Sequence, residues 1–164
     1  MSAVSGRERK RNPLINSASG GRALSAAQLP LFMLHPPRGF GVLTTTGRKS
    51  GKTRRRCIRA ARVGDRVYIV AIKGARTAWV KNVEATPQVR LRLPGGSFDG
   101  VGRRLLDEDE RREAAVAYCG RVNPFDYLEC MLWRSGRPTR AKIEDLHRGW
   151  FERGTPLVIR LRPG

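Results

Sequence analysis

The chain has 164 residues, the length of one domain with its own hydrophobic core. Hydrophobic residues make up 40% of it and charged residues 29%, which excludes a disordered chain. The formal net charge of +19 is lopsided, because residues 1–106 hold 22 basic and 4 acidic residues whereas residues 107–164 hold 11 and 10. The positive field therefore belongs to the first two-thirds of the chain.

Cysteine and histidine usage excludes two further classes of protein. The three cysteines, Cys57, Cys119 and Cys130, are too few and too scattered for a disulfide framework, so we expect reduced thiols and a cytoplasmic protein. No CxxC pair is present, and neither His35 nor His147 has metal-ligand spacing. No metal site is expected.

The N-terminal part of the chain predicts a tail followed by an apolar segment. Residues 1–24 are rich in Gly, Ser, Arg and Lys, which is typical of a flexible basic tail ahead of a single domain at residues 25–164. Residues 25–40 carry an apolar cluster at residues 29–34 that ends at Pro36. The cluster is far shorter than the ~20 residues that span a bilayer. It predicts a short helix or loop that packs on the core, with a surface-anchoring element as the alternative.

The apolar pattern then takes the period of two that is typical of β-strands. Val89, Leu91 and Leu93, for example, alternate with arginines and predict a half-buried strand with an outward basic face. The predicted strands are residues 41–46, 54–63, 66–72, 89–93 and 98–106, and residues 78–84 predict a short helix.

The last third of the chain is helical. Asp107 is a good N-cap, with Glu110 placed to close a capping box. Asn123 followed by proline starts a second helix, which Gly136 stops. Residues 138–150 form a third helix, and residues 157–162 a terminal strand that closes an antiparallel sheet or small barrel. The predicted fold class is α+β.

One segment concentrates the positive charge. Residues 47–62 contain eight basic residues and no acid: Arg48, Lys49, Lys52, Arg54, Arg55, Arg56, Arg59 and Arg62. Arginine forks grip phosphate and carboxylate oxygens, and lysine adds a mobile charge. Gly47 and Gly51 would let backbone amides turn toward an anion. The segment predicts an anion cradle, with a solvated basic loop as the equal alternative.

A second group of candidate residues follows the strand predicted at residues 66–72, whose apolar density indicates a central, buried strand. Lys73 stands at the end of that strand, Gly74 lets the chain turn, Trp79 offers a flat wall for a ring system, and Asn82 offers a donor and an acceptor. The alternative interpretation is that Trp79 is a core anchor and Asn82 a turn cap.

Taken together, LTTTGRKSGKTR, GDRVYIVAIKGA, AWVKNVEATPQVRLRL and PLVIRLRP resemble the deazaflavin-dependent nitroreductase and quinone reductase family of actinobacterial oxidoreductases. The resemblance runs from about residue 42 to residue 163. It implies a split β-barrel of the FMN-binding, flavin-reductase-like type, built of mainly antiparallel strands with flanking helices.

The resemblance also implies the coenzyme F-420, which has a flat tricycle, a phosphodiester and an oligoglutamate tail; FMN is the less favoured cofactor. The implied cofactor-binding residues are Arg48, Lys49, Ser50 and Arg54 for the phosphate and tail, and Val70, Ala71, Ile72, Lys73, Gly74, Trp79 and Asn82 around the ring. The implied reaction is hydride transfer from the reduced coenzyme to a quinone, a nitro compound or an activated enone.

The chain departs from the family pattern at two positions. Nitro-reducing members tend to have a hydroxyl residue where this chain has Ile72 and an aromatic residue where it has Arg59. These departures argue against efficient nitro reduction. Tyr127, on the second helix near Phe125 and Trp133, is the candidate proton donor, with a core-facing aromatic helix as the alternative.

Other functions are also compatible with parts of the sequence. A non-catalytic protein that binds deazaflavin, FMN or haem on the same barrel is the main alternative. A nucleic-acid-binding module fits the charge, but the basic run lacks the interleaved aromatics that stack on bases. Peripheral contact of the basic tail and residues 29–34 with an anionic membrane is a further expectation. The protein is expected to be a monomer or a homodimer.

Overall fold

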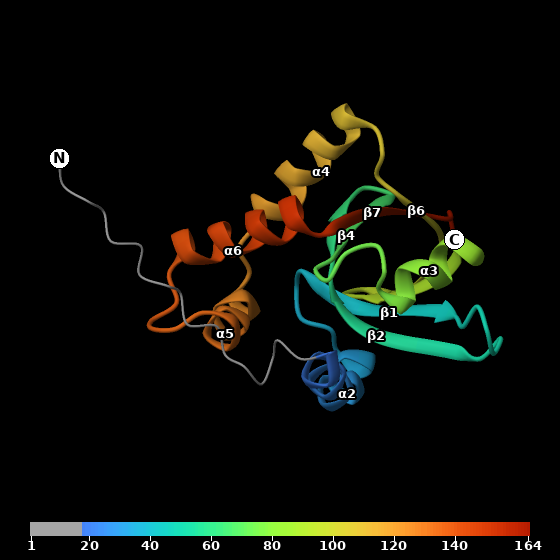
Figure 1. The fold of residues 1–164 in the computed structure, drawn as a ribbon, viewed down its shortest axis with the longest axis horizontal. Coiled ribbons are helices and arrows are strands. Elements are labelled where there is room, and N and C mark those ends of the chain that lie inside the picture. The colour runs from blue at the N-terminus through green and yellow to red at the C-terminus, as the bar shows by residue number, and fades with distance from the viewer. Residues whose placement is uncertain (1–17) are drawn as a thin grey trace.

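The computed structural model describes residues 18–164, which form one antiparallel sheet with helices around it (Figure 1). The helices are α2 (Ala18–Leu34), α3 (Ala78–Ala85), α4 (Glu108–Cys119), α5 (Pro124–Trp133) and α6 (Arg140–Arg153). The strands are β1 (Phe40–Thr46), β2 (Thr53–Arg59), β3 (Ala61–Val63), β4 (Arg66–Ala71), β5 (Gln88–Leu93), β6 (Gly96–Arg104) and β7 (Thr155–Leu161).

The strand order shows that the sheet must curl. The order is β2-β1-β5-β6-β7-β4-β3, so β2 and β3 are the two edges, yet only Ala60 separates them in the chain. The edges of a flat seven-stranded sheet would lie about 29 Å apart, six spacings of ~4.8 Å, whereas one linking residue spans less than ~8 Å. The sheet therefore bends round until its edges meet, which is the split-barrel architecture that the family resemblance implied.

The inner face of the barrel holds the main core. Leu43, Ile69, Leu91 and Ile159 are almost completely buried, and they come from strands far apart in the chain. Helix α3 adds the buried side chains of Trp79, Val80 and Val83 to the same cluster. The period-two pattern of the sequence sets which side chains point inward.

Helices cover the outer face of the barrel. Tyr68 and Val70 of β4, which alternate with the inward residues, pack with α4 and α6 in a second cluster that contains Tyr118 and Phe151. Helix α2 lies against β1 and β2, where Phe32 contacts Phe40 and the ring of Phe125 from α5. In Figure 1, α5 and α6 stand on the side of the sheet opposite to α3.

Two outward arginines of β5 have partners within the chain. Arg92 donates to the carbonyl oxygens of Met33 and Leu34 at 3.2 and 3.0 Å, where a cation complements the C-terminal end of α2. Arg90 pairs with Asp99 of the neighbouring strand at 2.7 Å. The basic face predicted for this strand is therefore partly engaged in holding the fold together.

The structure corrects several predicted boundaries. Residues 18–24, predicted as tail, belong to α2, because the helix begins at Ala18; residues 1–17 lie outside the described residues, and the division into a tail and one domain stays a prediction. The strand predicted at 54–63 is divided at Ala60 into two edge strands. The terminal strand, predicted at residues 157–162, is Thr155–Leu161, and it closes the sheet between β6 and β4.

Helix capping agrees with the sequence in part. Asp107 accepts the Glu110 amide as predicted, but the Glu110 carboxylate pairs with Arg103 at 2.6 Å and does not close a capping box. The box forms at α5, between Asn123 and Asp126. That helix ends at Trp133, before Gly136, which has a positive φ in the following turn. No helix among residues 18–164 is long and apolar enough to cross a bilayer.

Candidate functional site

Two adjoining pockets contain most of the predicted site residues. The first, here called the basic pocket, has a volume of about 550 Å³ and is lined in part by Gly47, Arg48, Lys49, Ser50, Arg54, Arg55 and Asn82. The second, here called the aromatic pocket, has a volume of about 140 Å³ and is lined in part by Phe32, Phe40, Tyr118, Phe125, Trp133 and Trp150. Arg56, Thr77 and Trp79 line both, so the pockets form one groove with a basic end and an aromatic end.

The wall of the basic pocket is the turn between β1 and β2. Gly47 donates to the carbonyl oxygen of Lys52 at 2.8 Å, and Gly51 donates back to the Gly47 carbonyl at 2.7 Å. Gly51 has φ +66°, a conformation that favours glycine. A Cβ at Gly47 would lie 2.9 Å from Ser50 Oγ, so the turn also requires a small residue there. These constraints present the side chains of Arg48, Lys49 and Arg54 to the pocket.

Five backbone amides of the turn are engaged within the chain and are not free for the predicted anion cradle. Gly47, Ser50 and Gly51 donate to carbonyl oxygens within the turn, and Lys52 donates to Ser50 Oγ at 3.3 Å. Arg48 donates its amide to Asn82 Oδ1 at 3.2 Å. These amides are therefore already engaged, and an anion in this pocket would depend on the side chains.

Asn82 ties the basic turn to α3. Its side chain is buried, accepts the Arg48 amide, and donates from Nδ2 to Thr45 Oγ1 at 3.4 Å. Asn82, which the family resemblance places around the ring, thus lines the basic pocket, and its side-chain amide also holds the turn in place. Trp79 is buried as well, so it serves both as the core anchor and as the wall that the two pockets share.

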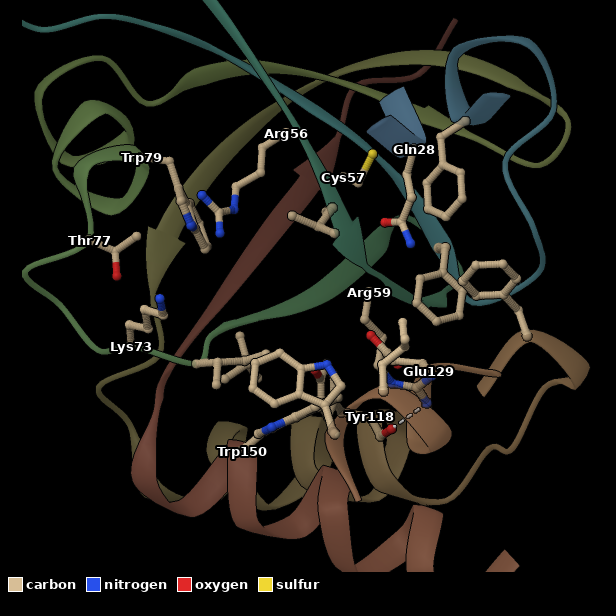
Figure 2. Close-up of a pocket in the computed structure, with 18 residues that line it drawn as sticks. Gln28, Arg56, Cys57, Arg59, Lys73, Thr77, Trp79, Tyr118, Glu129 and Trp150 are labelled. Carbon is tan, nitrogen blue, oxygen red and sulfur yellow. Dashed lines mark hydrogen bonds between the residues drawn. The ribbon is translucent and has the colours of Figure 1, made fainter. Parts of the chain in front are cut away.

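The residues around the end of β4 are divided between the pocket and the barrel. Val70, Ile72 and Lys73 line the aromatic pocket, as Figure 2 shows for Lys73 beside Thr77 and Trp79. Ala71 points into the barrel core, and Gly74, with φ +83°, forms the turn that donates to the Ala71 carbonyl at 2.9 Å. Neither Ala71 nor Gly74 is among the residues that line the two pockets.

Arg59, unassigned by the sequence, is the centre of a buried network. Its side chain is 5% exposed and forms an ion pair with Asp126 of α5, whose side chain is fully buried. It also donates to the carbonyl oxygens of Tyr118 and Arg121 at 3.1 and 2.9 Å. These contacts join the barrel to the helices, and breaking such a buried pair costs about 3–5 kcal/mol.

The electrostatics around this pair are unusual. Burial raises the pKa of Asp126, while the charge of Arg59 and the Asn123 amide oppose the rise. Burial, aided by the charge of Arg59, lowers the pKa of His147 to about 3, so its ring is neutral at pH 7. Burial raises the pKa of Glu129 to about 8, against the attraction of Arg59. Glu129 lies beside Arg59 and Tyr118 on the helical side of the aromatic pocket (Figure 2).

Three of these groups form a cluster with the residue types of a metal site, although the sequence predicted no metal site. Asp126, Glu129 and His147 each place one potential ligand atom within 4.8 Å of the others. The guanidinium of Arg59 already contacts the Asp126 carboxylate, and its fixed charge repels a cation at the same position. The cluster is therefore better suited to hold a proton than a metal ion.

Tyr127 lies apart from this network. It is 40% exposed and is not among the residues that line the two pockets. Its role as a proton donor stays a prediction from sequence. Its neighbours Phe125 and Trp133 do line the aromatic pocket, because they project from the other side of α5.

Sequence reasoning missed Arg59, Asp126, Glu129 and His147 as parts of the site. The spacing of Asp126 and Glu129 was an available signal, because residues three apart share one face of a helix. No signal connected them with Arg59, which lies 67 residues from Asp126 in the chain.

Comparison with known proteins finds a family model and several solved structures that are similar to this chain. The family model described as F420H(2)-dependent quinone reductase matches residues 32–127, more than half of the chain. Among solved structures, an F420-H2-dependent reductase, FDR-A, is 25% identical over 76% of this chain and 95% of its own, with a TM-score of 0.47.

Two further solved structures share the fold at lower identity. The haem storage protein HutZ of Vibrio cholerae is 12% identical over 84% of this chain and 90% of its own, with a TM-score of 0.52. A conserved hypothetical protein of Mycobacterium tuberculosis is 17% identical over 94% of this chain and 86% of its own, with a TM-score of 0.51. These similarities support the split-barrel fold.

Proposed function

The chain belongs to the F420H(2)-dependent quinone reductase family, and from this premise we propose that it transfers a hydride from reduced coenzyme F-420 to a small-molecule acceptor. A quinone is the favoured acceptor. The departures at Ile72 and Arg59 weigh against a nitro compound, and an activated enone is the second choice.

The observation that carries the proposal is the shared wall of the two pockets. Trp79 lines both, so one ligand can place a flat ring in the aromatic pocket and an anionic chain in the basic pocket. F-420 has this combination of a tricycle with a phosphodiester and carboxylates. No acidic residue is among the described residues that line the basic pocket, so the donors there match the coenzyme in charge.

In the basic pocket the proposed work is binding. Arg48, Lys49 and Arg54 are exposed cations that hold the phosphate and the tail, with Ser50 as a hydroxyl partner. Asn82 keeps the turn in position through its hydrogen bonds to Arg48 and Thr45. Binding energy from this remote end orients the reacting end.

In the aromatic pocket the proposed work is orientation and exclusion of water. Val70, Ile72 and the Trp79 indole give apolar walls, and Lys73 stands at the rim. When bound, the reduced deazaflavin supplies the hydride. The chain's own residues hold the ring and acceptor together and keep solvent away from them.

Fluorescence titration with F-420 tests the proposal. We expect wild-type protein to change the coenzyme fluorescence, and Lys49→Ala and Arg54→Ala to weaken binding by roughly tenfold each, ~1.4 kcal/mol. Lys81→Ala is the matched control, because Lys81 is an exposed cation of α3 that lines neither pocket. Unchanged fluorescence and melting temperature at saturating coenzyme would refute the assignment.

An acceptor assay separates an enzyme from a protein that only binds. We expect steady oxidation of reduced F-420 with menadione as the quinone. Binding without turnover across quinones, nitro compounds and enones would favour the non-catalytic alternative.

Contact with an anionic membrane is a separate proposal. It is supported by the exposed side chains of Leu31 and Leu34 at the end of α2, while the basic tail at 1–17 lies outside the described residues. Flotation with phosphatidylserine vesicles should carry the full-length protein and lose a Leu31→Ser, Leu34→Ser variant. Equal flotation of the two would refute a role for this helix.

A further inference from the structure

Glu129 is the acidic side chain that lines the aromatic pocket, and it is only partly accessible. Its Oε2 atom is buried and has no hydrogen-bond partner among the described residues. A buried carboxylate without a partner is strongly disfavoured, whereas a protonated carboxyl is a neutral donor. The pocket thus holds a carboxyl whose environment favours the proton.

No unpaired positive charge among the described residues around Glu129 is available to stabilise its carboxylate. Arg59 is the nearby cation from β2, and it is committed to Asp126 and to two backbone carbonyls. Asp126, one turn before Glu129 on α5, is a second carboxylate that opposes ionisation of Glu129. From α4 and α6, Tyr118 and His147 contribute neutral groups at pH 7, because burial raises the pKa of Tyr118 and lowers that of His147 to about 3.

We propose that Glu129 is the catalytic acid of this pocket, which donates its carboxyl proton to the acceptor as the acceptor is reduced. The inference rests on the proposed function. It assigns the proton-donor role to a residue on the same helix as Tyr127 but on the face that lines the pocket.

The step balances without a further reactant. Hydride addition delivers two electrons and one proton to the quinone and leaves negative charge on a quinone oxygen. The O–H bond of Glu129 breaks, a new O–H bond forms on that oxygen, and hydroquinone results. The Glu129 carboxylate then takes a proton from water. Arg59 is a positioning residue here, since its charge keeps the transient carboxylate from being prohibitively unstable.

Turnover of Glu129→Gln, which keeps the shape of the side chain but cannot give up a proton, is the direct test. We expect kcat with menadione to fall by roughly 10²-fold. Coenzyme affinity should be unchanged. Glu113→Gln is the matched control, because it changes an exposed carboxyl of α4 and should leave kcat unaltered. A Glu129→Gln enzyme within twofold of wild type, or a loss in Tyr127→Phe instead, would overturn the proposal.

The pH profile gives a second reading on the wild-type enzyme. The acid must carry its proton, so kcat should fall as the pH rises above about 8, the value to which burial raises the pKa of Glu129. This alkaline limb should be absent in Glu129→Gln. A limb that persists unchanged in the variant contradicts the assignment.

The protonation state is also measurable without turnover. Infrared spectra of the apo protein at pH 7 should contain the carbonyl stretch of a protonated carboxyl, and Glu129→Gln should lose it. Between pH 6.5 and 8 the folded chain retains this proton while the unfolded chain does not, so unfolding free energy should fall with rising pH in the wild type only. An ionised Glu129 in the apo protein would overturn the proposal.

These measurements distinguish failure of the Glu129 assignment from failure of the proposed reductase function. If the wild type binds and oxidises the coenzyme but Glu129→Gln behaves like wild type, the acid assignment fails alone. If the wild type neither binds nor oxidises the coenzyme, the proposed function fails and the acid assignment falls with it.

Discussion

The two ends of the groove are built on opposite principles. In the basic pocket, cations stand exposed on a tight turn whose backbone is internally hydrogen-bonded. At the aromatic end, Arg59 lines the pocket but is buried in an ion pair with Asp126 of α5. The first arrangement leaves charge available to a ligand, whereas the second uses charge to join the barrel to its helices. A basic residue can therefore belong to a site without being a ligand.

This contrast predicts that the same kind of substitution has very different effects on stability at the two ends. Asp126→Ala would leave the Arg59 guanidinium buried without its counter-ion, and we expect it to lower the unfolding free energy by about 3–5 kcal/mol. Arg54→Ala, at the exposed turn, should change it by less than about 0.5 kcal/mol. Urea denaturation of both variants measures the difference.

A double-mutant cycle measures how strongly Arg59 and Asp126 stabilise each other. Arg59→Met combined with Asp126→Ala should lose less stability than the two single changes added together, since neither charge is left alone. Strict additivity would mean that the two side chains act independently, and equal losses at Asp126 and Arg54 would remove the contrast between the pockets.

The buried histidine beside the Arg59–Asp126 pair should make the free energy of unfolding depend on pH at the acid side. Because burial lowers the pKa of His147 from 6.5 to about 3, the unfolded chain binds more protons in that range. Stability contributed by neutral His147 should therefore rise from pH 3 to pH 6.5 and be complete above it. In His147→Leu, this part of the dependence of unfolding free energy on pH should disappear. If the variant and the wild type had the same dependence, the conclusion that His147 is buried in its neutral form would be refuted.

A smaller effect than that of Asp126→Ala is expected at the turn of the basic pocket. Gly51 has φ +66°, and Gly64, in the turn between β3 and β4, has φ +61°; a Cβ at either would meet no atom within 4 Å. Changing either to Ala should cost about 1 kcal/mol of stability through backbone strain. Only Gly51→Ala should also weaken F-420 binding. Equal affinities in the two variants would show that the shape of the turn does not matter to the ligand.

The sequence by itself determined the local features of the protein. Alternation of apolar and polar residues in β5 predicted which of its side chains enter the barrel, because a strand sends successive side chains to opposite faces. The glycines and cations of residues 47–54 predicted a turn that presents positive charge. Asn123 followed by proline predicted the start of α5. Each of these features depends on neighbours in the chain.

Tertiary structure alone decided which distant residues meet. That Arg59 is buried rather than a ligand follows from its contact with Asp126, 67 residues away, and no local pattern encodes such a pair. The amides of the turn were predicted to face an anion, but Asn82, 34 residues from Arg48, engages one of them. Charge counts treat every arginine alike. Only the fold distinguishes those that stabilise it from those left exposed at the groove, because burial and pairing are properties of three-dimensional contacts.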